Sequence, residues 1–438
     1  MSKPQDTDWT RRKLLAAAGQ GLVAAAAVGA ALAPAEAQQP GTPPQGGKMQ
    51  SLPAPIQLDE INAPTEQKHG PTPTPMPPDQ RVGFAVVGLG HLALNQILPA
   101  FGECKRAKLT ALVSGDKAKG MQVASEYGVP ASGVYDYASY DQLKNNPAVD
   151  VIYIVLPNGL HEEYTVRGAA AGKHILCEKP MANNPQQAQH MIDACRAAQV
   201  KLMIAYRIQY EPNNKLAQQW VRDRQFGRVK VIEAVNGQNQ GDPNQWRQKK
   251  ALAGGGSLPD VGLYDLNTTR YLLGEEPYEV LGTTYATPGD PRFREVEETV
   301  LWQMRFPSGA LFNGTTGYGF HESRRYRVLA EKGWFGLDPA FSYSNLRMEL
   351  SQAQGMAEYR QTPSLDPKNQ FALEMDHMAE CVRQNKTPYT PGEEGLQDHR
   401  IMAAIYESAH AGKAVHLPRI ETLDTFRGKD RYETRTQS

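Results

Sequence analysis

Residues 81–93 of this 438-residue chain read RVGFAVVGLGHLA, and this stretch is the strongest indication of its fold. It opens with an apolar run, RVGFAVV, that is typical of a buried parallel strand. The run leads into a G-x-G-x-x-A turn made of Gly88, Leu89, Gly90, His91, Leu92 and Ala93. Gly88 permits the tight turn, Gly90 lets the backbone approach a pyrophosphate, and Ala93 lets the following helix pack closely on the strand. The stretch therefore predicts a dinucleotide-binding Rossmann domain.

Short apolar strands and helical patterns continue to alternate as far as residue 205, which predicts a doubly wound parallel sheet over residues 81–205. Ligands bind at the carboxyl ends of the strands in such sheets. Five segments fall at these predicted strand ends, and we expect them to share one site: Gly88–Ala93, Ser114, Pro157-Asn158, Glu178-Lys179-Pro180 and Tyr206-Arg207.

The end of the second predicted strand indicates which dinucleotide binds. A site for NAD usually places an acidic residue directly at this strand end, where it holds the ribose 2′-hydroxyl. Here Ser114 and Gly115 occupy that place, with Lys117 and Lys119 close behind. A hydroxyl and cations suit a 2′-phosphate, because the phosphate adds negative charge and acceptor oxygens. The pattern favours NADP, while Asp116 keeps NAD as the alternative.

From residue 206 the pattern changes to runs of strands without intervening helices. This predicts an α+β domain over residues 206–425, with a large open and mostly antiparallel sheet, followed by a tail over 426–438. Two amphipathic helices, over 371–383 and 395–412, are expected to pack back near the first domain. The predicted strands cover residues 229–235, 278–284, 299–306, 310–316, 325–330 and 334–337.

The first 37 residues have the pattern of an export signal. Arg11 and Arg12 form a twin-arginine pair before an Ala-rich apolar run, and Ala35-Glu36-Ala37 matches a small-x-small cleavage site. A membrane anchor is the alternative, but glycines dilute the run and a cleavage motif ends it. We expect a periplasmic protein with no stable membrane anchor. The Pro-rich residues 38–80 are expected to form an extended arm or a disordered spacer.

Composition narrows the range of partners. Lys+Arg and Asp+Glu both number 47, so there is no excess of positive charge to neutralise a phosphate backbone. We therefore expect no nucleic-acid partner. The four cysteines are scattered and form no C-x-x-C pair, so no metal site is expected.

Four motifs, in order, make the chain resemble the Gfo/Idh/MocA oxidoreductases from about residue 81 to 417. They are Gly88-x-Gly90, Leu156-Pro157-Asn158-x-x-His161, Glu178-Lys179-Pro180, and Gly254-Gly255-Gly256-Ser257-Leu258-Pro259-Asp260-x-x-x-Tyr264. Within the family the chain is most similar to the exported glucose–fructose oxidoreductases, which carry tyrosine where most members have histidine. The resemblance implies that the protein is a homodimer or homotetramer in which the second sheet faces partner subunits.

The resemblance also implies roles for individual residues. Lys179 is expected beside the nicotinamide and the sugar hydroxyls, with Pro180 in the cis form. Asp260 is expected to hold a substrate hydroxyl or Lys179, and Tyr264, on the same helix face, to act as acid or base. The cofactor wall is expected to include His161, Glu178, Arg207, Trp246 and Arg247, and the sugar wall Tyr206 and Tyr210, although a packing role is nearly as favoured for these tyrosines and Trp246.

The implied activity is oxidation of an aldose at C1 to its lactone, with NADP kept bound and reoxidised by a second sugar. Three alternatives stay open: an aldose dehydrogenase that releases NAD(P) at each turnover, an NAD-dependent glycosidase, and a non-catalytic sugar- or nucleotide-binding protein. A glycosidase would need an acid–base set unlike Asp260 and Tyr264. The intact set of Lys179, Asp260 and Tyr264 argues against a binding protein.

Overall fold

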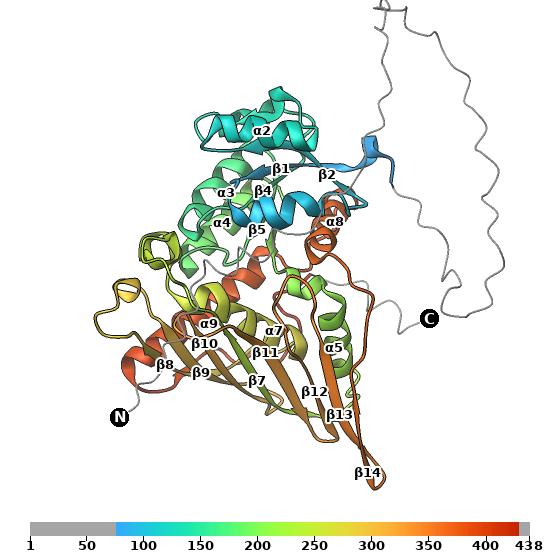
Figure 1. The fold of residues 1–438 in the computed structure, drawn as a ribbon, viewed down its shortest axis with the longest axis vertical. Helices are drawn as coiled ribbons and strands as arrows, with labels where there is room; N and C mark the ends of the chain where they lie inside the picture. The colour runs from blue at the N-terminus through green and yellow to red at the C-terminus, as the bar shows by residue number, and fades with distance from the viewer. Residues whose placement is uncertain (1–75, 429–438) are drawn as a thin grey trace, which may run out of the picture. The chain divides into compact units, whose positions relative to one another are not determined.

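A computed structural model describes residues 76–428 of the chain (Figure 1). The predicted signal peptide, most of the Pro-rich arm and most of the tail lie outside the described residues. Within residues 76–428, no helix is long and apolar enough to cross a membrane. All of these residues belong to one compact unit.

The first domain is built on a six-stranded parallel sheet with the order β3-β2-β1-β4-β5-β6. The strand order reverses between β1 and β4, which is where sheets of this topology bind their ligands. β1 is buried along its whole length, as its apolar sequence predicts. The strands are β1 (Val82–Val87), β2 (Ala107–Val113), β3 (Val134–Tyr135), β4 (Val151–Ile154), β5 (His174–Glu178) and β6 (Leu202–Ala205).

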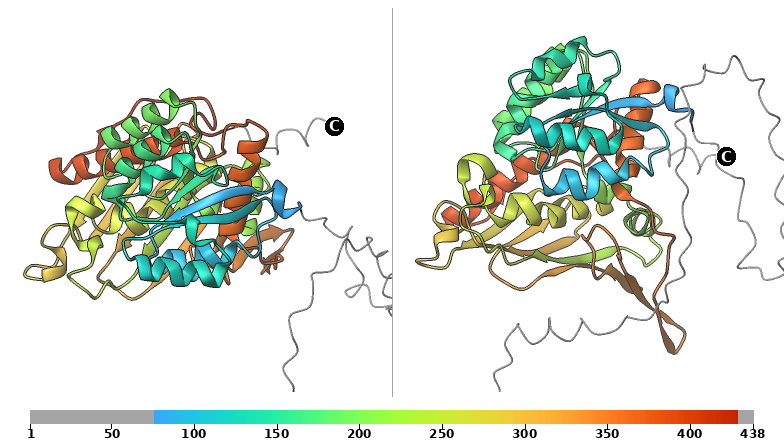
Figure 2. Two further views of the ribbon diagram at one scale, coloured as in Figure 1. Left: turned by 90° about the horizontal axis from the view of Figure 1, so that it is seen from above. Right: turned by 45° about the horizontal axis from the view of Figure 1, so that its top comes forward.

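Helices cover both faces of this sheet, and one of them comes from the far end of the chain. α8 (Gln370–Arg383) buries Phe371, Met375 and Met378 against Phe84 of β1 and its neighbours (Figures 1 and 2). The first domain is therefore completed by a helix that comes after residue 361, near the end of the chain. The other helices of this domain are α1 (Leu98–Ala100), preceded by a π-helical turn over Ala93–Ile97, α2 (Lys117–Tyr127), α3 (His161–Ala170) and α4 (Pro185–Ala197).

The second domain contains a nine-stranded sheet with the order β14-β13-β12-β11-β7-β10-β9-β8-β15. All neighbours pair antiparallel except β7 and β10, which are parallel, so the sheet is mixed. The prediction missed the hairpin of β13 and β14, whose last strand is exposed along its length and so lacks the alternation that reveals a strand. The strands are β7 (Val229–Gly237), β8 (Glu279–Tyr285), β9 (Thr299–Arg305), β10 (Leu311–Gly317), β11 (Ser323–Ala330), β12 (Gly333–Leu337), β13 (Met348–Gln354), β14 (Ala357–Gln361) and β15 (Val415–His416).

One face of this large sheet carries helices and the other is exposed. α5 (Pro212–Arg222), α7 (Leu263–Leu273) and α9 (Gly392–Ala411) lie between the large sheet and the first domain (Figure 1). On β9, alternate residues are buried beneath these helices or exposed on the outer face. The layers therefore place α7 where it can present side chains towards the strand ends of the first sheet.

Candidate active site

A cavity of about 620 Å³ opens at the carboxyl ends of the first sheet and extends to the elements that follow residue 206. It brings together most of the residues predicted from sequence: Gly88, Leu89, Gly90, His91, Leu92, Ser114, Gly115, Lys119, Leu156, Pro157, Asn158, Glu178, Lys179, Arg207, Trp246, Arg247, Asp260 and Tyr264. Ala93, Lys117, His161, Tyr206 and Tyr210 are not among its lining residues.

The glycine turn has the geometry that its sequence requires. Gly88 has φ +95°, and a Cβ there would lie 2.3 Å from the carbonyl oxygen of Val155. A Cβ at Gly90 would meet nothing within 4 Å, so the backbone at this position borders open cavity. This cradle fits the pyrophosphate of a dinucleotide, which needs close approach to the backbone. Ala93 lies inside, fully buried against the sheet, where it supports the turn from behind.

The end of β2 presents a hydroxyl and one lysine to the cavity. Ser114 is buried, and its Oγ accepts a hydrogen bond from the Asp116 backbone N–H. The Asp116 carboxylate caps α2 by accepting from the Lys119 N–H at 3.1 Å. Only Oδ1 makes this bond, and Asp116 also lines the cavity, so its other oxygen is available to a ligand. Lys119 lines the cavity, whereas Lys117 does not.

His161 has a supporting position rather than the expected cofactor contact. Its ring is fully buried, with Nδ1 2.9 Å from the Pro180 oxygen and Nε2 2.8 Å from the Leu156 oxygen. The ring therefore ties the loop after β4 to the loop after β5. Asn158 links the loop after β4 to a different segment, because its side-chain N–H₂ donates to the oxygen of Ala253, directly before the glycine loop, at 2.9 Å.

Lys179 is fixed by Asp260. The Lys179–Pro180 peptide bond is cis, as expected. Lys179 Nζ donates to the Asp260 carbonyl oxygen at 2.7 Å and lies 3.3 Å from Asp260 Oδ1. Burial alone would lower the pKa of Lys179, but Tyr264, Asp260 and Glu178 raise it above its ordinary value. The lysine is therefore a cation held at the cavity wall.

Asp260 is an ionised carboxylate with three protein partners. Besides Lys179, it accepts from Arg247 Nε at 2.9 Å and from Tyr318 Oη at 2.6 Å, both on Oδ2. Burial acts to raise its pKa, but Arg247 and Lys179 outweigh burial and hold the pKa below its usual range. Of the two roles expected for Asp260, the contacts provide the one that holds the lysine. Tyr318, at the end of β10, was not predicted as a site residue.

Tyr264 lies between two cations. Its ring centroid is 4.6 Å from Lys179 Nζ and 4.8 Å from Arg207 Cζ. Both distances are within the range of cation–π attraction. Tyr264 and Asp260 both line the cavity even though a π-helical turn, Leu258–Gly262, precedes α7. Two positive charges therefore lie close to the Tyr264 ring.

Arg207 is anchored from behind and connects Tyr264 to a second tyrosine. Its guanidinium donates to the Phe341 oxygen at 2.7 Å and to the Gln370 side chain, and its Cζ lies 4.6 Å from the Tyr343 ring centroid. Tyr343 lines the cavity and is 46% exposed, so it is available to a ligand. No sequence pattern marks Tyr343, because it belongs to the irregular segment between β12 and β13.

Tyr206 and Tyr210 pack inside the protein instead of forming the sugar wall. Tyr206 is 5% and Tyr210 4% exposed. Tyr210 Oη is 3.1 Å from Thr390 Oγ1, and its ring lies 5.2 Å from that of His377. The packing role that the sequence left open is the one these two residues have. Trp246, by contrast, lines the cavity with its ring against the Arg247 guanidinium.

The glycine loop before α7 is shaped by Glu297. The Glu297 carboxylate accepts from the N–H groups of Gly256 and Leu258 at 2.8 and 3.0 Å, and from Tyr406 Oη at 2.9 Å. A Cβ at Gly256 would lie 1.9 Å from the Glu297 carbonyl oxygen. The loop thus has room only for glycine where it approaches Glu297, and this contact positions the turn that carries Asp260.

Over residues 76–428, no group of three or more His, Cys, Asp or Glu side chains is arranged to hold a metal ion. All four cysteines are buried, and none of them forms a disulfide bond. The cavity offers the side chains of a lysine, tyrosines and arginines to what it binds.

Comparisons with known proteins agree with this architecture. Residues 82–206 match the model of the GFO/IDH/MocA oxidoreductase family with an NAD-binding Rossmann fold, and residues 218–417 match the C-terminal alpha/beta domain of the same family. A D-xylose 1-dehydrogenase [NADP(+)] from Haloarcula marismortui is 30% identical over 355 residues, covering 77% of this chain and 94% of that protein. A D-xylose 1-dehydrogenase (NADP(+)) 2 from Haloferax volcanii is also 30% identical, covering 76% and 99%.

Among solved structures, an aldose–aldose oxidoreductase from Caulobacter crescentus, complexed with glycerol, is 43% identical with a TM-score of 0.75. The match covers 77% of this chain and 100% of the Caulobacter chain. The two family models and the relatives covered over nearly their full length lead to the same family. The chain belongs to the GFO/IDH/MocA oxidoreductase family.

Proposed function

We propose that the chain oxidises an aldose at C1 to its lactone, with NADP as the hydride acceptor. The arrangement of Lys179, Asp260 and Tyr264 across one cavity from the glycine turn carries this proposal. The two haloarchaeal relatives, by name, oxidise an aldose with NADP, and the Caulobacter relative is an aldose–aldose oxidoreductase.

The residues of the cavity divide the work of C1 oxidation. NADP, when bound, accepts the hydride. Tyr264 takes the proton of the anomeric hydroxyl, and the cations Lys179 and Arg207 lie against its ring. Lys179, held by Asp260, keeps a donor for the substrate oxygen, and Tyr343 offers an aromatic face and a hydroxyl to the sugar.

NADP is preferred because of the end of β2. Ser114 and Lys119 line the cavity and offer a hydroxyl and a cation to a 2′-phosphate. Asp116 lines the same cavity and is the residue that NAD would need for its ribose 2′-hydroxyl, while the two named NADP-dependent relatives favour NADP.

Replacing the lysine tests the assignment of the site. Lys179→Ala should lower kcat/KM for aldose oxidation by roughly 10²–10⁴-fold, the usual range for loss of a group that organises proton transfer. Binding of NADP, followed by quenching of tryptophan fluorescence, should change much less. Full activity in Lys179→Ala would refute the proposed site.

We further propose that NADP stays bound and is reoxidised by a second sugar. The name of the Caulobacter relative describes transfer between two aldoses, which requires no free cofactor in the overall reaction. Protein purified without added nucleotide should then convert pairs of aldoses and ketoses, one to a lactone and the other to an alditol. Activity only when NADP is added would favour a dehydrogenase that releases its cofactor.

Export and assembly also belong to the proposal. The twin-arginine pattern of residues 1–37 leads us to propose a periplasmic location, which fractionation and N-terminal sequencing of the mature protein would test.

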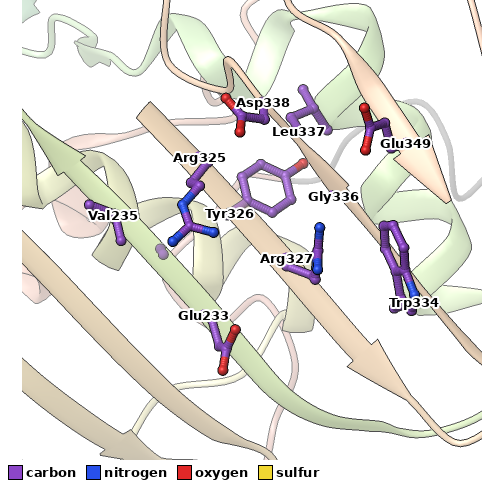
Figure 3. Close-up of a pocket in the computed structure, with 11 residues that line it drawn as sticks. Glu233, Val235, Arg325, Tyr326, Arg327, Trp334, Gly336, Leu337, Asp338 and Glu349 are labelled. Atoms are coloured by element: carbon purple, nitrogen blue, oxygen red, sulfur yellow. The ribbon is translucent and has the colours of Figure 1, made fainter. Parts of the chain in front are cut away.

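For a homodimer or homotetramer, the exposed face of the large sheet is the proposed contact. It carries Leu281, Leu301 and Leu311, each at least 42% exposed, and a shallow pocket near Arg327 and Trp334 (Figure 3). Light scattering on Leu301→Lys should then show a smaller assembly than the unsubstituted protein.

A further inference from the structure

Three polar side chains meet inside the protein directly behind the cavity wall. Tyr153, on β4, places its Oη 2.8 Å from Glu178 Oε1 and 3.0 Å from Glu374 Oε1. Glu178 is the last residue of β5 and lines the cavity beside Lys179, and Glu374 lies on α8. Tyr153 and Glu374 are 0% exposed and Glu178 is 7% exposed. Because water does not reach most of this group, its hydrogen-bond donors and acceptors must pair with one another.

The number of protons in this group follows from its contacts. A phenol has one hydrogen, so Tyr153 can donate fully to only one of the two carboxyl groups. The other contact is a hydrogen bond only if that carboxyl group carries a proton and donates it to the phenol oxygen. Two ionised carboxylates at one buried phenol would also repel each other without a cation between them. One of the two glutamates is therefore neutral.

The surrounding charges decide which glutamate it is. Burial raises the pKa of Glu178 above its ordinary value, although Lys179, the hydrogen bond from Tyr153 and Arg207 all act to lower it. Burial and the negative charge of Glu178 raise the pKa of Glu374 well above its usual range, and of the cations only Arg207 opposes them. Glu374 Oε2 has no hydrogen-bond partner among the described residues, so nothing compensates a full charge on it.

Other titratable groups near the cluster do not change which glutamate carries the proton. On the side of α8, the Asp376 carboxylate accepts from the backbone N–H groups of Lys105, Arg106 and Ala107. Burial raises the pKa of the Cys104 thiol, which leaves it neutral. On the cavity side, burial raises the pKa of Tyr343. Lys179 and Arg207 are thus the charges that act on the cluster, and both favour ionisation of Glu178.

We propose that Glu374 is a protonated acid that donates to Tyr153, that Tyr153 donates to Glu178, and that this chain of hydrogen bonds holds Glu178 ionised beside Lys179. Glu374 and Tyr153 are then positioning residues, since they act on the catalytic lysine only through Glu178. The role in catalysis rests on the proposed function of Lys179, whereas the protonation of Glu374 does not.

Infrared spectroscopy of the purified protein near pH 7 tests the protonation without any need for turnover. The difference spectrum between the unsubstituted protein and Glu374→Gln should show loss of the C=O stretching band of a carboxylic acid. The corresponding difference for Glu178→Gln should show loss of carboxylate bands. Loss of carboxylate bands in Glu374→Gln would overturn the proposal, and it would do so even if the protein proved not to oxidise sugars.

The pH dependence of kcat/KM tests the positioning role. Tyr153→Phe removes the donor to Glu178, so the pKa of Glu178 should rise and the acid limb of the profile should move up by about one pH unit. In Glu374→Gln the amide can still donate to Tyr153, so the acid limb should keep its position whatever the rate.

A matched control separates this effect from the loss of any buried phenol. Tyr140 is also fully buried, and its Oη donates to the Tyr164 oxygen at 2.7 Å, away from the cavity. Tyr140→Phe should lower the melting temperature without moving the acid limb. An acid limb that stays in place in Tyr153→Phe, or that moves equally in Tyr140→Phe, would overturn the positioning role.

Discussion

At the scale of single residues, Asp260 has the densest set of partners in the cavity. Its carboxylate holds Lys179, Arg247 and Tyr318, and removing its charge leaves two cations without their counter-ion. Asp260→Asn should lower the free energy of unfolding by about 3–5 kcal/mol at pH 7, the usual cost of breaking a buried ion pair. Tyr318→Phe, which removes one hydrogen bond to the same carboxylate, should cost about 1.5–3 kcal/mol. Chemical denaturation measures both.

The contribution of Asp260 should also depend on pH in a fixed direction. Its pKa is lower in the folded protein than in the unfolded chain, so its stabilising effect is present above the unfolded pKa of about 3.9. The effect is lost as the pH falls towards the folded pKa. The difference in unfolding free energy between the unsubstituted protein and Asp260→Asn should therefore be full at pH 7 and shrink below about pH 4. A difference that stays constant to pH 3 would argue against this account.

Two neighbouring lysines offer a matched pair for the cofactor. Lys119 lines the cavity and Lys117 does not, although both belong to the first turn of α2. Lys119→Ala should weaken binding of NADP by roughly tenfold, because a charge-assisted contact to the 2′-phosphate is lost, and leave binding of NAD nearly unchanged. Lys117→Ala should leave both unchanged. Fluorescence titration measures the Kd of each variant for NADP and for NAD relative to the unsubstituted protein. Equal losses of affinity for NADP and NAD in Lys119→Ala would contradict a 2′-phosphate site.

At the scale of elements, the glycine loop before α7 is positioned by sterics as much as by hydrogen bonds. Gly256→Ala would place a Cβ 1.9 Å from the Glu297 carbonyl oxygen, so the loop must shift and move Asp260 with it. We expect a loss of about 1–3 kcal/mol in stability and of most activity. Gly241→Ala is the control, because a Cβ there meets nothing within 4 Å. Thermal melts and initial rates distinguish the two.

The elements also show what could be predicted from the sequence. The strand of residues 82–87, the glycine turn and the Lys179 and Tyr264 segments were located because each carries a local pattern. Tyr318 and Tyr343 were missed because what makes them site residues is contact with Asp260 and Arg207, 58 and 136 positions away in sequence, and no local pattern records such a contact. His161 was assigned to the cofactor from its motif, but its two carbonyl partners make it a support for the loops around the site.

At the scale of the whole molecule, α8 couples the two sheets. It follows β7–β14 of the large sheet in sequence, yet its apolar face is buried against the first sheet in one cluster with Phe84, Leu112 and Leu176. The first domain therefore lacks one covering layer until the chain is nearly complete. The same helix carries Glu374 and Gln370, so it also reaches the cavity from behind through Tyr153 and Arg207.

This coupling predicts that the two domains unfold together. All described tryptophans lie beyond residue 205, so their fluorescence reports on the second domain, while far-ultraviolet circular dichroism reports on both. Met378, fully buried on α8, contacts the first sheet, and Met378→Ala should lower stability by about 2–5 kcal/mol. Both signals should shift to lower denaturant by the same amount, since one cooperative transition includes both sheets. Met356→Ala, at a fully exposed position, should change stability by no more than about 0.5 kcal/mol. If Met378→Ala instead splits the two signals, with fluorescence unchanged, the domains unfold separately and α8 does not couple them.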